Sequence, residues 1–109
     1  MELLPGPYEL LELEDGGALS TRISNWELGE VTIHPAYKPE GKQVTTLRIH
    51  VPQTDKEFFP FYWDVTSQTL IAQLVPHLEQ PHFELKTYII IKHGVAPSAR
   101  FTLEVKVPK

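Results

Sequence analysis

Hydrophobic and polar positions alternate along much of the chain, and a period of about two predicts β-strands. The pattern is clearest at residues 44–51, where Leu47 and Ile49 alternate with Arg48 and His50. β-Branched residues are frequent in this segment, which also favours a strand. The other segments that the alternation predicts as strands are residues 8–14, 18–24, 26–34, 83–93 and 99–107.

Glycine and proline fall mainly between these segments and predict the turns. Asp15-Gly16-Gly17 favours a hairpin turn that joins residues 8–14 to residues 18–24. Pro35, Pro39 and Gly41 form the next loop, and residues 94–98 form the turn between the last two strands. Gly29 interrupts residues 26–34, and a glycine inside a strand indicates a bulge.

The period changes after residue 63 from that of a strand to that of a helix. Leu70, Leu74 and Leu78 recur at helical spacing, so they predict one buried stripe of an amphipathic helix. Thr66 is a suitable N-cap. Pro76 lacks an N–H group and is expected to kink or end the helix near its own position.

The last two strands have one apolar and one polar face in this interpretation. Phe101, Leu103 and Val105 point toward the core, while Ile89 and Ile91 do so from the preceding strand. The opposite face then carries a group of basic residues around one aromatic side chain, made up of Lys86, Tyr88, Lys92, Arg100 and Lys106. Arg48 extends this group if its strand pairs nearby.

The order of elements predicts a mainly β fold of the α+β type. We expect an antiparallel curved sheet or a small OB-like barrel, with one amphipathic helix between the middle strands and the C-terminal hairpin. The 109 residues form one domain, and residues 1–7 form a loose N-terminal segment before it.

Composition excludes several classes of protein. The chain has no cysteine, so disulfides, zinc–thiolate sites and cysteine nucleophiles are absent. No apolar run approaches the roughly 20 residues that span a bilayer, and the first residues do not resemble a signal peptide. We therefore expect a cytoplasmic protein without membrane contact.

Charge is distributed unevenly along the chain. The formal net charge is −4, and the first 15 residues contain five acidic side chains but no Lys or Arg. Residues 86–109 contain five basic side chains and one acidic one. The molecule is either polarised or carries an ordinary scatter of surface charges.

The basic hairpin suggests single-stranded nucleic-acid binding without catalysis. Lysine and arginine neutralise phosphates, and an exposed aromatic ring stacks on a base. In this hypothesis Lys86, Lys92, Arg100, Lys106 and Arg48 contact phosphates, and Tyr88 stacks. The overall acidity argues against it, and a solvated sheet face remains the alternative.

Residues 58–63 contain five aromatic side chains in six positions. Pro60 restricts the segment to an edge strand or an extended loop. Most of these rings are expected in the core. Tyr62 is expected to be the most exposed, and Tyr62 and Phe59 are the candidates for partner docking. A protein-interaction module or a self-assembling homo-oligomer, using these rings or a sheet edge, is therefore the second hypothesis.

No known catalytic motif occurs, and we expect neither enzymatic activity nor a cofactor nor a metal site. His34 and His50 lie on different predicted strands and can meet across a sheet. Asp55, Glu57 and Asp64 flank the aromatic run, so a small carbohydrate-binding protein or hydrolase is the third hypothesis.

Overall fold

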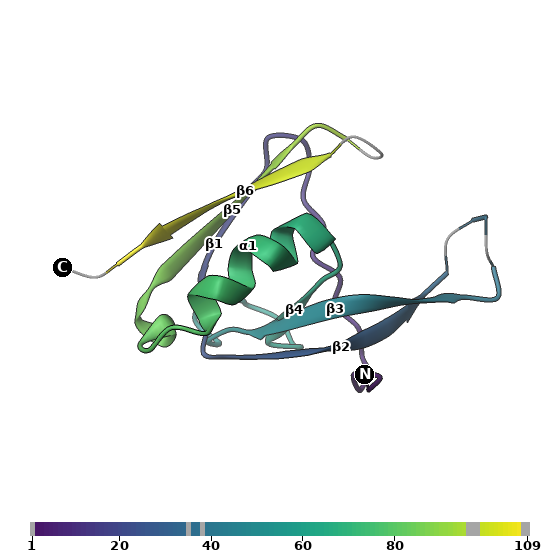
Figure 1. Ribbon diagram of the computed structural model, residues 1–109, viewed down its shortest axis with the longest axis horizontal. Coiled ribbons are helices and arrows are strands. Elements are labelled where there is room, and N and C mark those ends of the chain that lie inside the picture. Colours follow the sequence, from purple (N-terminus) through teal and green to yellow (C-terminus); the bar gives the residue numbers. More distant parts are fainter. Residues whose placement is uncertain (1, 35, 38, 96–98, 108–109) are drawn as a thin grey trace.

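The computed structural model describes residues 2–34, 36–37, 39–95 and 99–107. Within these residues, six strands form two three-stranded antiparallel sheets with an α-helix between them (Figure 1). One sheet has the order β1–β5–β6, with β1 at Ala18–Arg22, β5 at Thr87–His93 and β6 at Arg100–Lys106. The other has the order β2–β3–β4, with β2 at Asn25–Ile33, β3 at Lys42–His50 and β4 at Tyr62–Val65.

The two sheets are joined where the chain bends between β1 and β2. Only Ile23 and Ser24 separate these strands, and the Ser24 N–H donates to the His50 carbonyl at 2.8 Å. From this bend the sheets diverge, and the described strands do not close into a barrel (Figure 1). The mainly β class with one helix is confirmed, whereas the expected barrel closure is not observed.

The helix α1 (Gln68–Leu78) fills the space between the sheets (Figure 1). Its predicted apolar stripe is confirmed, because Leu70, Ile71, Leu74 and Leu78 are all buried. Ser67 rather than Thr66 is the N-cap, and its Oγ accepts the Leu70 N–H at 3.4 Å. Pro76 lies inside the helix, which ends two residues later.

The core lies between α1 and the two sheets. The strand β3 supplies Leu47 and Ile49, which are fully buried, as the alternation predicted. Ile23 at the bend is also fully buried, so the point where the chain changes sheets is fixed by apolar packing. The β5–β6 hairpin is confirmed, and β6 turns Phe101, Leu103 and Val105 toward this core.

Residues 8–14 do not form the predicted strand. They contain a single parallel bridge between Leu10 and Asp64, and β1 pairs with β5 instead of with this segment. The turn predicted at residues 15–17 is present, since the Gly17 N–H donates to the Glu14 carbonyl at 2.8 Å. The long apolar strand β5 offers β1 a continuous ladder, which the interrupted segment 8–14 cannot provide.

Gly29 does not mark a bulge, because the β2–β3 register passes through it without interruption and pairs it with Thr46. Instead, a Cβ atom at this position would lie 2.6 Å from Leu4 Cγ. The glycine therefore makes room for a segment that packs on the sheet. That segment includes residues that were expected to be loose, since Leu4 is only 6% exposed.

The strand predicted at residues 83–93 is shorter, and its inner face is the opposite one. A 3₁₀-helix, η1 (Phe83–Leu85), precedes β5. Tyr88 and Ile90 are completely buried, whereas Ile89 and Ile91 lie on the outer face and are half-buried. Both faces of this strand carry large apolar side chains, so the period alone did not determine which one is buried.

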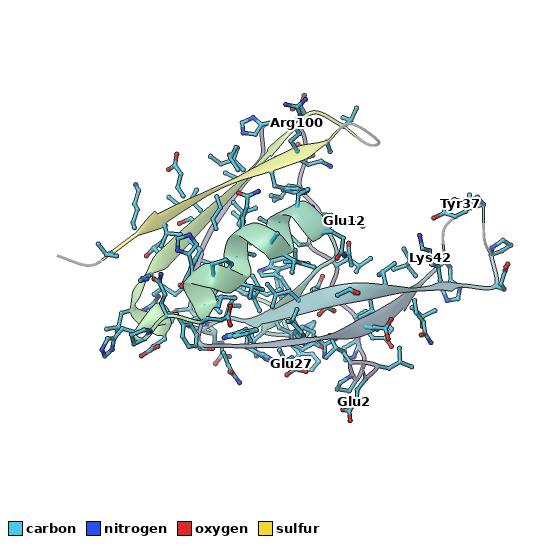
Figure 2. The ribbon with its side chains drawn as sticks, viewed as in Figure 1. Glu2, Glu12, Glu27, Tyr37, Lys42 and Arg100 are labelled. Atoms are coloured by element: carbon cyan, nitrogen blue, oxygen red, sulfur yellow. The ribbon has the colours of Figure 1, made fainter. Side chains whose placement is uncertain are left out.

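The β2–β3 hairpin extends beyond the rest of the molecule, with Tyr37 and Lys42 near its far end (Figure 2). Pro35, in its predicted loop, and residues 96–98, in the predicted β5–β6 turn, lie outside the described residues. None of the helices in the described part of the chain is long and apolar enough to cross a membrane.

Candidate functional site

The predicted basic face of the β5–β6 hairpin does not exist as one surface. Residues that pair across an antiparallel ladder share a face. Lys92 is opposite Phe101 and Tyr88 is opposite Val105, so both lie on the face that packs toward α1. Arg100, opposite His93, and Lys106, opposite Thr87, lie on the outer face.

Tyr88 is unavailable for stacking because its side chain is completely buried. Its hydroxyl donates to the Phe83 carbonyl at 2.9 Å, which satisfies the polar end of the ring. Burial, with a smaller effect from Glu84, raises the pKa of Tyr88 above its usual range. Tyr88 therefore acts as a neutral core residue that ties η1 to β5.

The remaining basic residues of the hypothesis are dispersed. Lys86 precedes β5 and donates to Gln80 Oε1 at 2.8 Å. Arg48 belongs to the other sheet and is only 2% exposed. Of the six predicted residues, Arg100 and Lys106 remain as exposed cations on a shared face, with Glu104 between them along β6.

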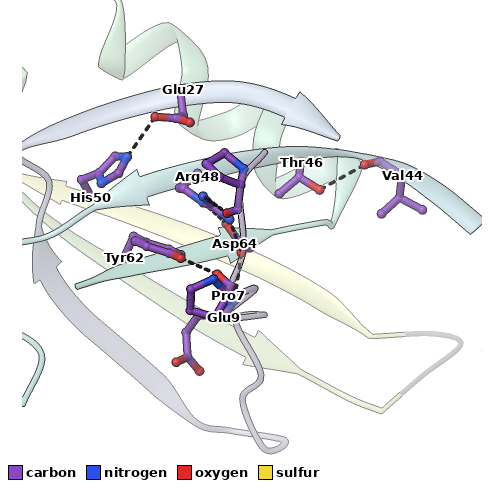
Figure 3. Close-up of polar contacts among 10 residues, drawn as sticks. Pro7, Glu9, Glu27, Val44, Thr46, Arg48, His50, Tyr62 and Asp64 are labelled. Atoms are coloured by element: carbon purple, nitrogen blue, oxygen red, sulfur yellow. Dashed lines mark hydrogen bonds and ion pairs between the residues drawn. The ribbon is translucent and has the colours of Figure 1, made fainter. Parts of the chain in front are cut away.

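The outer face of the β2–β3–β4 sheet, opposite to the face that bears Leu47 and Ile49, carries a group of interacting polar side chains (Figure 3). Arg48 on β3 and Asp64 on β4 are paired directly across the ladder and form a two-pronged ion pair. Arg48 Nε donates to Asp64 Oδ1 at 2.7 Å, and its Nη2 donates to Oδ2 at 3.1 Å. Both side chains are nearly inaccessible to solvent.

Burial acts against the charge on Arg48, but Asp64 more than compensates. Desolvation lowers the pKa of Arg48, while the hydrogen bonds and the negative charge of Asp64 raise it to a value above the usual one. The guanidinium group also lies over the Tyr62 ring, 4.1 Å from the ring centre. The guanidinium group therefore keeps its positive charge, and the ion pair holds it in position.

Three further titratable groups, Glu27, His50 and Tyr62, complete the outer face. His50 Nε2 lies 3.1 Å from Glu27 Oε2, and the imidazole contacts the Tyr62 ring edge-on, with ring centres 5.5 Å apart. The Tyr62 hydroxyl donates to the Pro7 carbonyl, and burial raises the pKa of Tyr62. Tyr62 was predicted to be the ring most available to a partner. It instead contacts the protein's own chain.

Residues 2–11, which we call the N-terminal strap, cross this face from one sheet edge to the other. At the β2 edge the Leu4 N–H donates to the Glu30 carbonyl at 2.8 Å. At the β4 edge the Leu11 N–H donates to the Asp64 carbonyl at 2.9 Å. Between these ends, Arg48 Nη1 donates to the Pro5 carbonyl at 2.7 Å. The ion pair therefore holds the strap as well as the sheet.

The loop before β4 displays two aromatic side chains, Phe58 and Phe59, each 72% exposed. The expectation that most rings of residues 58–63 are buried is wrong for these two. Phe59 contacts Phe61 edge-on, with ring centres 6.0 Å apart. Phe59, which was predicted as a candidate for partner docking, is thus exposed, and Phe58 is equally exposed.

Two ion pairs anchor this loop to the rest of the fold. Lys56, only 9% exposed, donates to the Phe58 carbonyl at 2.9 Å and to Glu9 Oε2 at 3.4 Å. Arg22 at the end of β1 contacts Asp55, with Nε to Oδ2 at 3.2 Å. The Arg22 hydrogen bond is the main reason why the pKa of Asp55 lies below its usual value. The exposed rings are therefore carried by a restrained loop.

The residues of the predicted carboxylate group and of the predicted histidine pair do not come together. Asp55 and Asp64 bind different arginines, so the predicted carboxylate group near the aromatics does not converge. His34 contacts the Pro39 carbonyl and does not meet His50. Within the described residues, no group of three or more His, Asp or Glu side chains is placed to hold a metal ion.

A small apolar cavity of about 150 Å³ lies where the strap, α1 and β6 meet. Leu11, Leu70 and Phe101 contribute its apolar lining, and Ser67 borders it at the helix start. The cavity is smaller than the usual volume of a ligand pocket. We regard it as a packing gap between the sheets.

Sequence reasoning identified Arg48, His50 and Tyr62 but missed how they meet. Asp64 was grouped with Asp55 and Glu57 around the aromatic run, and Glu9 and Lys56 were not considered. One signal was present: Arg48 and Asp64 each interrupt a strand whose neighbouring positions are apolar. A charged residue in such a position requires a partner of opposite sign, but the strand register that joins them is not visible in the sequence.

No model of a known protein family matches the chain, and no curated protein or solved structure is significantly similar to it. Its function must therefore be argued from its own geometry.

Replacing Arg48 with methionine should lower the free energy of unfolding by about 3–5 kcal/mol, because Asp64 would remain buried without its counter-ion. Arg22→Met is the matched control, since its ion pair with Asp55 is partly exposed on the Arg22 side and should contribute at most about 1 kcal/mol. Urea denaturation measures both. Equal losses for the two variants would contradict a special role for the buried pair.

The pKa of Asp55 is lowered from 3.8, so its ionised form stabilises the folded state above that pH. The contribution is lost as the pH falls through the lower folded-state pKa. Wild type should therefore exceed Asp55→Asn in stability by up to about 1 kcal/mol at neutral pH and by much less near about pH 3. In an Arg22→Gln background the difference should shrink, and a pH-independent difference would contradict the assignment.

Proposed function

We propose that this protein is a non-catalytic binding module that docks a partner protein through the exposed aromatic pair, Phe58 and Phe59. The observation that carries the proposal is that both rings are 72% exposed on one restrained loop. Burying such a side chain is worth about 1.5–3 kcal/mol. Two adjacent rings therefore give a partner an anchor of the kind that dominates protein interfaces.

The pair costs little to order on binding, because the loop is already fixed. Lys56 holds the Phe58 carbonyl, and Asp55 is bound to Arg22. The Asp55 N–H also closes a turn by donating to the Pro52 carbonyl at 2.9 Å. A restrained loop loses less conformational entropy in a complex than a flexible one does.

The charge of the surroundings indicates what kind of partner fits. Glu57 precedes the pair and is exposed, and the whole chain carries a formal net charge of −4. A partner with an apolar pocket and a basic rim would complement this surface. A second copy is disfavoured, because a two-fold interface would place Glu57 and its surroundings against themselves.

The test is site-specific photo-crosslinking in the cells from which the chain comes, with p-benzoylphenylalanine replacing Phe59. This aromatic replacement should crosslink to a defined protein of basic character. The matched control places the same group at Leu85, which is also exposed but lies in η1. The crosslink should be absent at Leu85 and should be lost when Phe58→Ser is added.

Equal crosslinking from positions 59 and 85 would contradict the proposal. So would a crosslink from position 59 only to another copy of this chain. That second result would favour self-assembly instead.

A second candidate function is single-stranded nucleic-acid binding by an OB-like module. The path of the strands supports it: if β1 and β2 count as one bent strand, the order along the chain is three strands, the helix and two strands. OB-like folds have this order and bind oligonucleotides. The cations that support it are Arg100 and Lys106, and Glu104 lies between them.

A fluorescent single-stranded DNA of about 20 nucleotides tests this candidate. Wild type should bind at low salt and release the DNA as salt rises, since phosphate contacts displace counterions. Arg100→Glu/Lys106→Glu should abolish binding. Glu104→Lys, which adds a cation between the two, should strengthen it. No binding by the wild type at low salt would exclude this candidate and leave the aromatic pair.

A further inference from the structure

The N-terminal strap occupies its sheet in the manner of a bound peptide. It contributes no strand to either sheet, and it meets β2 and β4 at single parallel bridges, Leu3 to Glu30 and Leu10 to Asp64. Its first residues lie on the side of β2 that faces away from α1 (Figure 1). The strap is therefore a separate layer on a sheet whose other face already packs against the core.

One end of the strap fits a specific shape in the sheet. Leu4 packs over Gly29, where an added Cβ would lie 2.6 Å from Leu4 Cγ and 2.9 Å from the Glu2 carbonyl oxygen. The Glu30 N–H donates to that same carbonyl at 2.9 Å. The Leu4 side chain thus packs over Gly29, and backbone hydrogen bonds join the strap to β2 next to this contact.

The other end fits a specific set of polar groups. The Glu9 N–H donates to Asp64 Oδ2 at 2.9 Å, and the Asp64 N–H donates to the Glu9 carbonyl at 2.7 Å. In the middle, Arg48 and Tyr62 bind the carbonyls of Pro5 and Pro7 (Figure 3). Along the strap, the sheet thus contacts first a leucine side chain, then two backbone carbonyls, and finally a segment that hydrogen-bonds to the edge of β4.

We propose that the outer face of the β2–β3–β4 sheet is an acceptor groove for an extended strand, and that the strap of a second copy of this chain can occupy it. An identical segment offers the same leucine, carbonyls and edge groups, so exchange requires no new contact. The strap continues into β1 through residues 12–17, which include Gly16 at φ +80° and Gly17. Movement of this connection would release the strap while leaving both sheets paired.

The strands that form the groove pair with one another, although Leu11 of the strap also packs against the core. The β2–β3 ladder pairs residues from Asn25 to Ile33 with residues from His50 to Lys42, and Asp64 is held by Arg48. Within a single copy the attached strap has the advantage of a high effective concentration. In the wild type each groove is therefore occupied by the strap of the same copy. Exchange between copies is expected when that strap can no longer bind its own groove.

Two variants separate the donor from the acceptor. Leu4→Asp disables the strap but leaves its groove open. Gly29→Val fills the groove and leaves its own strap free, and valine suits a strand. Each variant alone should sediment as a monomer, whereas an equimolar mixture should form a 1:1 dimer in analytical ultracentrifugation. A mixture of two correctly folded variants that stays monomeric would overturn the proposal.

Hydrogen exchange on the unmodified protein keeps the proposal testable if a variant fails to fold. The Leu4 and Leu11 amides should exchange at least about tenfold faster than the Ile49 amide, because the strap opens without global unfolding. Exchange of all three at the rate of global unfolding would show that the strap never leaves its groove, and exchange between copies would then be excluded. Neither experiment involves Phe58 or Phe59, so the outcome is independent of the proposed function.

Discussion

The ion pair between Arg48 and Asp64 is the interaction on which the outer half of this structure depends. Removing two charges from water costs several kcal/mol each, and a buried pair recovers this only with good geometry and further hydrogen bonds. Here the geometry is a two-pronged contact at 2.7 and 3.1 Å, and the remaining groups bind the Pro5 carbonyl and the Glu9 N–H. Because those two partners belong to the N-terminal strap, the strap supplies the hydrogen bonds that make the burial of the pair tolerable. The strap and the pair thus stabilise each other.

This mutual dependence explains why a small protein covers both faces of one sheet. The inner face of β2–β3–β4 contributes Leu47 and Ile49 to the core, whereas Leu4 packs over Gly29 on its outer face. On the outer face of the opposite sheet, Arg100 and Lys106 are exposed to solvent. The difference follows from the side chains: a buried ion pair needs partners that exclude water, while solvated cations need none.

Most of the fold could be predicted where only one face of an element is apolar. The strand β3 alternates between core and polar residues, and α1 has a single apolar stripe, so both were predicted close to their observed limits. The strand β5 has Tyr88 and Ile90 on one face and Ile89 and Ile91 on the other, and local pattern cannot choose between two apolar faces. The Tyr88 hydroxyl donates to the Phe83 carbonyl, which belongs to η1, a turn that the alternation did not predict. The wrong choice of face assigned Tyr88 to a solvent-exposed site, whereas its side chain is buried.

The candidate surfaces were harder to predict than the fold because they depend on contacts distant in sequence. Glu9 and Lys56 are 47 residues apart, and their contact decides that the loop bearing Phe58 is held in place. Without that anchor, an aromatic-rich segment would be expected to collapse onto the core, since exposed rings are costly in water. Lys56 instead pairs with Glu9 and donates a hydrogen bond to the Phe58 carbonyl, which restrains the backbone that carries the two rings. The loop that carries Phe58 and Phe59 is therefore tied, through Lys56 and Glu9, to the same N-terminal segment that covers Arg48 and Asp64, and the two surfaces for which we propose partners are structurally connected.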